Sequence, residues 1–398
     1  MEEKETIVYL NNAATSWPKP ACVCDAVRDA VQGLPPGQFR SGSGAYQGDV
    51  FEECRTLLGR ILGIRDSGRI CFTSGATESM NLVLRGLGIP SGQVITTVTE
   101  HNSVLRPLYN LPGIAKGSAG HGAATGKNAA SPVLLPCDEN GIVDPAAFEK
   151  AAAAGPQRPG VLILNHCSNV TGAVQDAAAF GEIAKRYGFL FLLDASQSAG
   201  CMKVDADAWK TDAVIFTGHK SLMGISGSGG FFLREGVPFS PVKFGGTGRE
   251  SEKLVFGPGE ASMEAGTQNV PGICALKAGV SWILEKGVDR IREQEQDLRR
   301  MAAEALSQIE GITLFGRDHC TGPVLSFCAR TLSPSDLGYI LNSSYNIVTR
   351  SGLHCSPLIH DYIGSGKRGT VRISFSPFTT REDILALADA LRQILYVS

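Results

Sequence analysis

Short apolar runs that end in polar or small residues recur along the chain, and helical patterns lie between them. The strands that they predict lie at residues 69–73, 93–98, 161–164, 189–194 and 213–216. A short apolar run without alternation is typical of a strand that is buried on both faces, as in a parallel sheet. Helices are predicted at residues 22–32, 49–62, 176–187, 270–284 and 288–309. Strands that alternate with helices indicate an α/β fold.

The length of the chain indicates two domains rather than one. At 398 residues the chain exceeds the usual size of a single domain, and a composition that is 43% hydrophobic can fill a large core. We assign residues 19–258 to a large domain. Residues 1–18 and 259–398 are assigned to a small one.

Composition and charge exclude several classes of function. With 37 basic and 39 acidic residues the net charge is −2, which predicts no nucleic acid partner. We find neither a run of 18 apolar residues nor a signal-peptide pattern, and therefore expect no membrane partner and a cytoplasmic location. Eleven cysteines, an odd number without any CxxC spacing, indicate reduced thiols and no metal site.

Two of the predicted strands lead to residues that pyridoxal phosphate (PLP) chemistry requires. The strand at 189–194 ends in Asp194, and the strand at 213–216 leads to Lys220. Because the carboxyl ends of parallel strands meet at one edge of a sheet, the acid and the amine arrive together. A lysine holds the cofactor aldehyde as a Schiff base, and an aspartate keeps the pyridine nitrogen protonated. Taken alone, such an aspartate is often a helix cap and such a lysine is usually solvated.

The segments around this pair resemble the class V aminotransferase family of fold type I PLP enzymes, in particular its cysteine desulfurase and selenocysteine lyase branch. The matching segments are Asp194-Ala195-Ser196-Gln197-Ser198 and Thr217-Gly218-His219-Lys220, and the resemblance extends from Asn11 to about Phe378. It implies a mostly parallel seven-stranded sheet with helices on both faces, plus a smaller α+β domain. It also implies an antiparallel strand at residues 230–233.

A phosphate site is expected where Ser74-Gly75-Ala76-Thr77-Glu78 joins a strand to a helix. Free amide groups and the helix dipole attract an anion at such a point, although the segment alone is also typical of an ordinary capped helix. The resemblance makes Ala76 and Thr77 the phosphate-binding residues. It adds Thr217 and His219 to the phosphate contacts.

The resemblance implies further roles around the ring of the cofactor. His101 would stack on the pyridine ring and pass protons, and Gln197 would bind the phenolic oxygen. Asn169 would reach both that oxygen and the substrate carboxylate. Ala14 belongs to an Asn-Ala-Ala-Thr segment whose backbone would lie near the substrate, and Thr267 would bind the phosphate held by the other subunit of a homodimer.

Cys355 and Arg372 indicate which reaction of the family to expect. The stretch Arg350-Ser351-Gly352-Leu353-His354-Cys355-Ser356-Pro357 is similar to the loop that carries the nucleophilic thiol of cysteine desulfurases, with Arg350 as a possible support. A buried structural thiol is the usual alternative for a free cysteine. Arg372 lies in a strand pattern at residues 369–374, and a planar guanidinium suits bidentate capture of an α-carboxylate.

The resemblance therefore implies a PLP-dependent cysteine desulfurase that converts L-cysteine to L-alanine and passes a persulfide on Cys355 to a sulfur-acceptor protein. L-selenocysteine remains open as a substrate, and so does another class V aminotransferase or β-lyase reaction. The alternative that is not an enzyme is a scaffold of the same fold that only binds a sulfur-transfer partner. The loop at residues 41–45 lacks the histidine of many relatives, which leaves the substrate preference open. A low-complexity stretch at residues 116–131 is expected to be a surface loop.

Overall fold

The structure is a computed structural model. It describes residues 7–33, 49–89, 94–112, 131–154, 160–246, 252–255, 263–317 and 320–397. The predicted loop at residues 41–45 lies outside the described residues, as does the low-complexity stretch up to residue 130.

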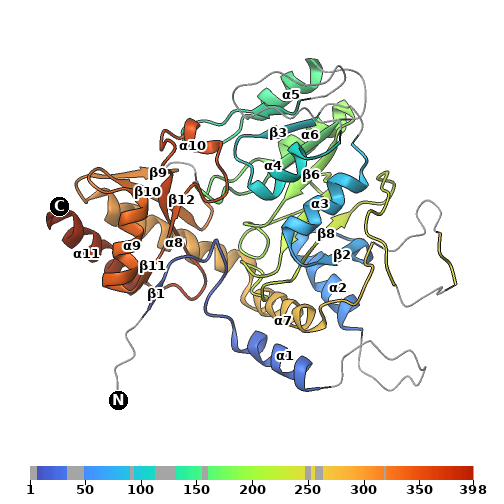
Figure 1. Ribbon diagram of the computed structural model, residues 1–398, viewed down its shortest axis with the longest axis horizontal. Helices are drawn as coiled ribbons and strands as arrows, with labels where there is room; N and C mark the ends of the chain where they lie inside the picture. Colours follow the sequence, from blue (N-terminus) through green and yellow to red (C-terminus); the bar gives the residue numbers. More distant parts are fainter. Residues whose placement is uncertain are drawn as a thin grey trace.

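A seven-stranded sheet in the order β2-β8-β7-β6-β5-β3-β4 forms the centre of the larger unit (Figure 1). Its strands are β2 (Ile70–Thr73), β3 (Val94–Thr97), β4 (Val133–Leu135), β5 (Val161–Asn165), β6 (Leu190–Asp194), β7 (Ala213–Thr217) and β8 (Gly229–Leu233). Strands β3 to β7 pair in parallel, whereas β8 pairs antiparallel with both β2 and β7. The predicted mostly parallel sheet and its antiparallel strand are confirmed.

Helices cover both faces of this sheet, as predicted. Successive strand residues point to opposite faces: Phe191 and Leu193 join one core cluster, and Leu192 joins the other. The first face is covered by α2 (Val50–Leu62), α5 (Pro145–Ala154), α6 (Ala177–Tyr187) and α7 (Val270–Lys286). The second is covered by α3 (Ala76–Gly86) and α4 (Asn102–Tyr109). Helix α1 (Ala21–Gln32) packs against α7.

Local sequence signals explain where these helices begin and end. The side chain of Asp49 accepts hydrogen bonds from the amides of the first turn of α2, and Asp176 does the same for α6. Gly63 and Gly188 end the same two helices in the left-handed conformation, which glycine adopts without a steric cost.

The smaller unit combines an antiparallel sheet with three long helices. The sheet has the order β12-β13-β10-β9, and a parallel pair, β1-β11, lies beside it. These strands are β1 (Val8–Tyr9), β9 (Ile312–Phe315), β10 (Val324–Ala329), β11 (Ile347–Val348), β12 (Arg350–Gly352) and β13 (Thr370–Ser374). The helices are α8 (Val288–Ser307), α9 (Pro334–Tyr345), α11 (Arg381–Val397) and the short α10 (Ile359–Tyr362).

The two units have separate cores. Side chains of β1, α8, α9 and α11 form the core of the smaller unit, whereas α7 contributes Ile273, Leu276 and Val280 to the larger one. The predicted domain boundary after residue 258 stays a prediction. Helix α7, the first helix after that residue, packs into the core of the larger unit. Within the described residues, no helix is both long enough and apolar enough to cross a bilayer.

Candidate active site

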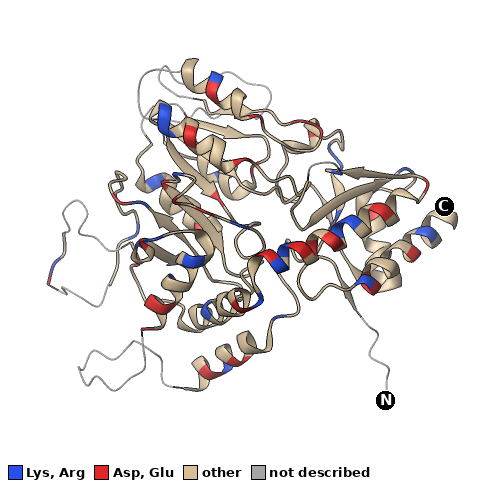
Figure 2. Ribbon diagram, turned by 180° about the vertical axis from the view of Figure 1, so that it is seen from behind, with Lys and Arg blue, Asp and Glu red and all other residues tan. Residues whose placement is uncertain are grey.

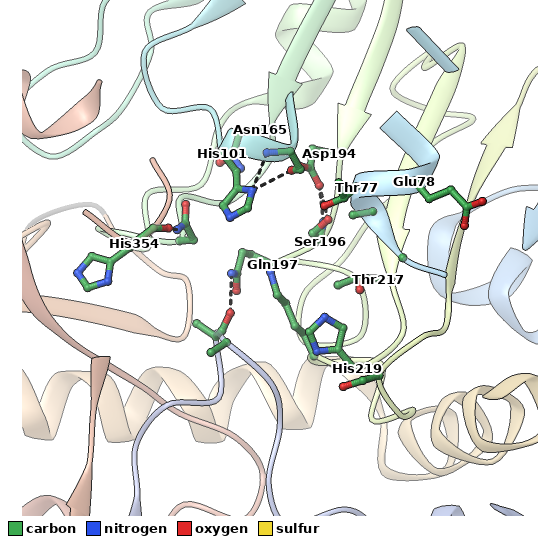
Figure 3. A pocket seen from close by; sticks show the side chains of 18 of the residues that line it. Thr77, Glu78, His101, Asn165, Asp194, Ser196, Gln197, Thr217, His219 and His354 are labelled. Carbon is green, nitrogen blue, oxygen red and sulfur yellow. Dashed lines mark hydrogen bonds between the residues drawn. The ribbon is translucent and has the colours of Figure 1, made fainter. Parts of the chain in front are cut away.

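A cavity of about 380 Å³ lies where β5, β6 and β7 end, at the junction of the two units. Ligands of open α/β sheets bind at the carboxyl ends of the strands, so this is the expected place. Figure 3 shows His101, Asp194 and Gln197 around the cavity, with His354 and His219 on opposite sides of it. The predicted residues that line it are Ala14, Ala76, Thr77, His101, Asn169, Asp194, Gln197, Thr217, His219, Lys220 and Arg372.

Lys220 and Asp194 reach this cavity together, as the strand ends predicted. Asp194 is 2% exposed, and its Oδ1 accepts hydrogen bonds from the amide and the hydroxyl of Ser196 (Figure 3). Burial lowers the pKa of Lys220 to about 8; Asp194 opposes that shift, and Arg372 adds to it. Roughly a tenth of the amine is therefore neutral near pH 7, far more than for an ordinary lysine.

His101 is the first residue before α4 and caps that helix. Its Nδ1 accepts a hydrogen bond from the amide of Ser103 at 3.0 Å, which leaves the proton of a neutral ring on Nε2. Burial lowers the pKa of His101 to about 3, and the charges of Lys220 and Arg350 add to this effect. The imidazole is therefore neutral.

One end of the cavity is shaped to receive an anion. Helix α3 begins at Ala76 without a side-chain cap, and Gly75 before it has a φ of 146°, in the region that favours glycine. Glu78 also lines the cavity; its carboxylate accepts a hydrogen bond from Ser74 N at 2.7 Å and pairs with Lys243, which balances part of its charge. The first amides of α3 are available to an anion at this end of the cavity.

Two guanidinium groups stand at the other end. Arg350 and Arg372 are direct neighbours on the antiparallel strands β12 and β13, where like charges repel. Neither forms an ion pair with a described residue, and Nε of Arg372 has no hydrogen-bond partner. Burial, together with Arg350, lowers the pKa of Arg372 to about 9. The pair leaves an uncompensated positive charge that a carboxylate would neutralise.

Cys355 lies beside this pair rather than on a remote surface. Nη2 of Arg350 donates a hydrogen bond to Sγ of Cys355 at 3.3 Å, and the Cys355 carbonyl accepts one from Asn102 N at 2.7 Å. His354 and Cys355 both have positive φ values, 53° and 61°, which costs conformational energy in residues other than glycine. The thiol is thus held next to the cavity by a strained and hydrogen-bonded loop.

Asn169 contributes to that loop, which the sequence did not predict. Its Nδ2 donates to the carbonyl of His354 at 2.7 Å, and its Oδ1 accepts from the Ser356 hydroxyl at 2.7 Å. Both amide atoms of Asn169 are therefore engaged by the neighbours of Cys355. The expected contacts of Asn169 with cofactor and substrate stay a prediction.

Gln197 lines the cavity as expected, whereas Thr267 does not. Gln197 donates from Nε2 to the Ala13 carbonyl at 3.0 Å, which ties the predicted Asn-Ala-Ala-Thr segment to the end of β6. Thr267 is exposed and does not line the cavity of its own chain, and its role in a second subunit stays a prediction.

Glu100 is a buried acid of this site that sequence analysis missed. It has no exposed surface, and its Oε1 accepts hydrogen bonds from Thr97 Oγ1 and Asn165 N, both at 2.9 Å. Burial raises the pKa of Glu100 to about 8, to which the charge of Asp194 contributes. The only sequence signal was a glutamate next to His101 at the end of a buried strand. Its burial follows from the tertiary packing.

Comparisons with known proteins agree with this geometry. A family model described as Aminotransferase class-V matches residues 8–387. Probable cysteine desulfurases of Methanothermobacter thermautotrophicus and Pyrococcus abyssi are 29% and 30% identical to this chain, over 97% and 98% of it and 94% and 95% of their own lengths.

Solved structures are similar over the same extent. The apo structure of a cysteine desulfurase from Thermococcus onnurineus has a TM-score of 0.84 at 30% identity, and a cysteine desulfurase from Escherichia coli has 0.83 at 26%. Both comparisons cover 98% of this chain and 95% of the other. The chain belongs to the class V aminotransferase family.

Proposed function

We propose that the protein is a PLP-dependent cysteine desulfurase that converts L-cysteine to L-alanine and keeps the sulfur as a persulfide on Cys355. The observation that carries the proposal is the contact of Cys355 Sγ with Arg350, a residue that lines the cavity shared by Lys220 and Asp194. A structural thiol would not need a cationic partner at the edge of such a cavity.

The cavity fits PLP at three points. The uncapped first turn of α3, at Ala76 and Thr77, offers amides to the phosphate. Asp194 forms no ion pair within the described part of the chain and is free to receive the pyridinium. The partly neutral amine of Lys220 suits bond formation with an aldehyde. When bound, PLP supplies an electron-accepting ring.

We assign the following roles in the reaction to residues of this chain. Arg372 and Arg350 bind the substrate carboxylate, and Lys220 removes the proton from Cα. The thiolate of Cys355 attacks the substrate sulfur, so that a sulfur–sulfur bond forms as the carbon–sulfur bond breaks. Cβ takes up a proton in place of sulfur, and Lys220 returns the proton to Cα. L-cysteine and the enzyme thiol thus become L-alanine and the enzyme persulfide.

His101, Gln197 and Asn169 would hold the ring and its oxygen, and Thr217 and His219 the phosphate. His101 is neutral, so it can stack on a protonated ring without charge repulsion.

We further propose a homodimer, in which Thr267 reaches the phosphate of the other subunit. The exposed segment that contains Thr267 lies beside residues 244–246, since Gly266 N donates to the Gly246 carbonyl at 2.8 Å. Phe244 in that segment is 70% exposed, and the second subunit would cover it. A sulfur-acceptor protein and a cytoplasmic location belong to the same proposal.

The test is to incubate the purified protein with L-cysteine and to measure L-alanine, sulfide and the mass of the Cys355 peptide. We expect one added sulfur on that peptide. In Cys355→Ser the visible band of bound PLP should persist while alanine release falls by about 10²-fold or more, the usual loss when a covalent catalyst is removed.

Cys274→Ser is the matched control, because Cys274 is a half-buried thiol on α7 that does not line the cavity. It should keep full activity. Undiminished alanine release from Cys355→Ser would refute the persulfide mechanism. If Cys355→Ser released alanine faster from L-selenocysteine than from L-cysteine, the result would favour a selenocysteine lyase.

A further inference from the structure

The N-terminal segment at residues 11–19 crosses from the smaller unit to the larger one and passes beside Lys220. Figure 1 shows it in dark blue between β1, in the smaller unit, and α1, which packs against α7 of the larger unit. Residues 15–19 have no role in the reaction steps described above, yet they bind the peptide groups next to Lys220.

Both peptide groups that flank Lys220 are held by this segment. The carbonyl of His219, in the peptide before Lys220, accepts hydrogen bonds from Ser16 N at 3.0 Å and from Thr15 Oγ1 at 3.1 Å. The carbonyl of Lys220 itself accepts one from Ser16 Oγ at 2.8 Å. The backbone from which the amine of Lys220 projects is therefore fixed on both sides.

Lys19 adds a charged donor to these contacts. Its Nζ donates to the His219 carbonyl at 3.0 Å and to Ser16 Oγ at 2.7 Å. Because an ammonium group can only donate, the Ser16 hydroxyl must accept from Lys19, and its own proton is left for a carbonyl. The Lys220 carbonyl is the nearer one, at 2.8 Å against 3.2 Å for that of His219. Lys19 thus acts on one peptide group directly and on the other through Ser16.

The charge of Lys19 has no carboxylate partner among the described residues. Elsewhere, for example along α8, basic residues lie among acidic ones (Figure 2). Lys19 is half-buried, and both of its hydrogen-bond acceptors are uncharged. Burial lowers the pKa of Lys19 to about 8, although Cys24 opposes this shift, so the ammonium is mostly protonated at pH 7. Burying an unpaired charge costs free energy, which indicates a role in the site rather than in stability alone.

The same segment also holds the strand that carries Arg372. Ala13 N donates to Ser374 Oγ at 2.8 Å, and Asn11 Oδ1 accepts from Nη2 of Arg372 at 3.3 Å. One continuous segment therefore connects the guanidinium assigned to the substrate carboxylate with the backbone of Lys220. The two groups have to act on one small molecule, so their relative position matters for the rate.

We propose that Lys19 is a positioning residue for Lys220. Its ammonium group holds the Ser16 hydroxyl and the His219 carbonyl, and so fixes the amine of Lys220 where it meets the aldehyde of PLP and the Cα proton of the substrate. Only the second of these two tasks rests on the proposed function. Bond formation with PLP does not depend on which reaction follows.

The test is to compare Lys19→Met, which keeps the length of the side chain but has no donor, with the wild type. The cofactor is removed from the purified full-length protein with hydroxylamine, PLP is added back, and the growth of the visible band is followed. We expect the band to form about tenfold more slowly in Lys19→Met, the effect of losing a charged hydrogen bond that aligns a reacting group. With L-cysteine, kcat should fall by a similar factor while KM stays unchanged.

Three further variants show whether the effect comes from this network. Lys19→Arg keeps a charged donor and should restore most of both rates. Ser16→Ala should slow the same steps, and the double variant should lose less than the product of the single losses, because Ser16 and Lys19 share one network. Lys277→Met is the matched control, since Lys277 is also half-buried but pairs with Glu53 and does not line the cavity. It should leave both rates unchanged.

Equal rates of band formation in Lys19→Met and the wild type would overturn the proposal. Equal slowing by Lys277→Met, or no recovery in Lys19→Arg, would do the same. Should Lys19→Met fail to fold, unchanged band formation in Ser16→Ala would be the refuting result. If the band formed slowly in Lys19→Met while the wild type made no alanine from L-cysteine, the positioning role would stand and the proposed reaction would be wrong.

Discussion

Replacing Glu100 by glutamine is expected to make the protein less sensitive to pH. Burial raises the pKa of Glu100 from 4.5 to about 8, so the folded protein keeps a proton that the unfolded chain loses above pH 4.5. The stabilising contribution is fully present below pH 4.5 and falls as the pH rises towards 8. At about 1.36 kcal/mol per pH unit, the wild type should lose on the order of 2.5 kcal/mol between pH 5 and pH 7 through this group.

Glu100→Gln removes the titrating proton but keeps an oxygen that can accept from Thr97 Oγ1 and Asn165 N. The assay is urea unfolding of both proteins at pH 5, 6, 7 and 8, at one protein concentration. The difference in free energy of unfolding between variant and wild type should rise in favour of the variant by about 2.5 kcal/mol from pH 5 to pH 7. Glu293→Gln, an exposed change on α8, is the control.

A difference that stays constant across this pH range would show that Glu100 is ionised in the folded protein. The same result would remove the conclusion that burial keeps the Glu100 carboxyl protonated near neutral pH.

Further predictions concern the amine, the cysteine loop and the phosphate turn. Lys220→Ala should lower alanine formation by about 10²-fold or more, measured with L-cysteine, because general-base catalysis is lost. Ser356→Ala removes the hydrogen bond to Asn169 Oδ1 and should cost about 1 kcal/mol in local stability, seen as faster amide exchange of the loop. Gly229→Ala puts a Cβ 2.6 Å from Gly75 Cα, and should cost about 1–3 kcal/mol of unfolding free energy and weaken retention of PLP in dialysis.

Two controls separate these effects from general damage. Ser343→Ala changes an exposed serine of α9 and should leave the exchange of the loop unaltered. Gly68→Ala meets no atom closer than 3.7 Å and should leave both stability and PLP retention as in the wild type. If Gly229→Ala behaved like Gly68→Ala, the close packing of β8 on the turn before α3 would not matter for the site.

Much of the fold could be predicted because it depends on local patterns. Continuous apolar runs at residues 189–194 and 213–216 became β6 and β7, since strands buried on both faces need apolar residues throughout. The rule that parallel strands end at one edge then brought Asp194 and Lys220 together before any coordinates were known.

The distant parts of the site depended on a resemblance rather than on local patterns. Arg372 and Cys355 lie more than a hundred residues beyond Lys220, and no periodicity relates them to it. Their positions in segments that resemble those of the family predicted that they approach the cavity. It did not predict that Arg350 contacts the Cys355 thiol or that Asn169 binds both neighbours of that thiol.

The sequence by itself determined most strands of the seven-stranded sheet, about half of the helices, the edge of the sheet where the site lies and the acid and amine at that edge. Only the tertiary structure decided which groups are neutral and which charges lack an ionic partner, as Glu100 and Arg350 illustrate. The physical reason is that burial and pairing are set by segments far apart in the chain, whereas strand and helix periods are set by neighbouring residues.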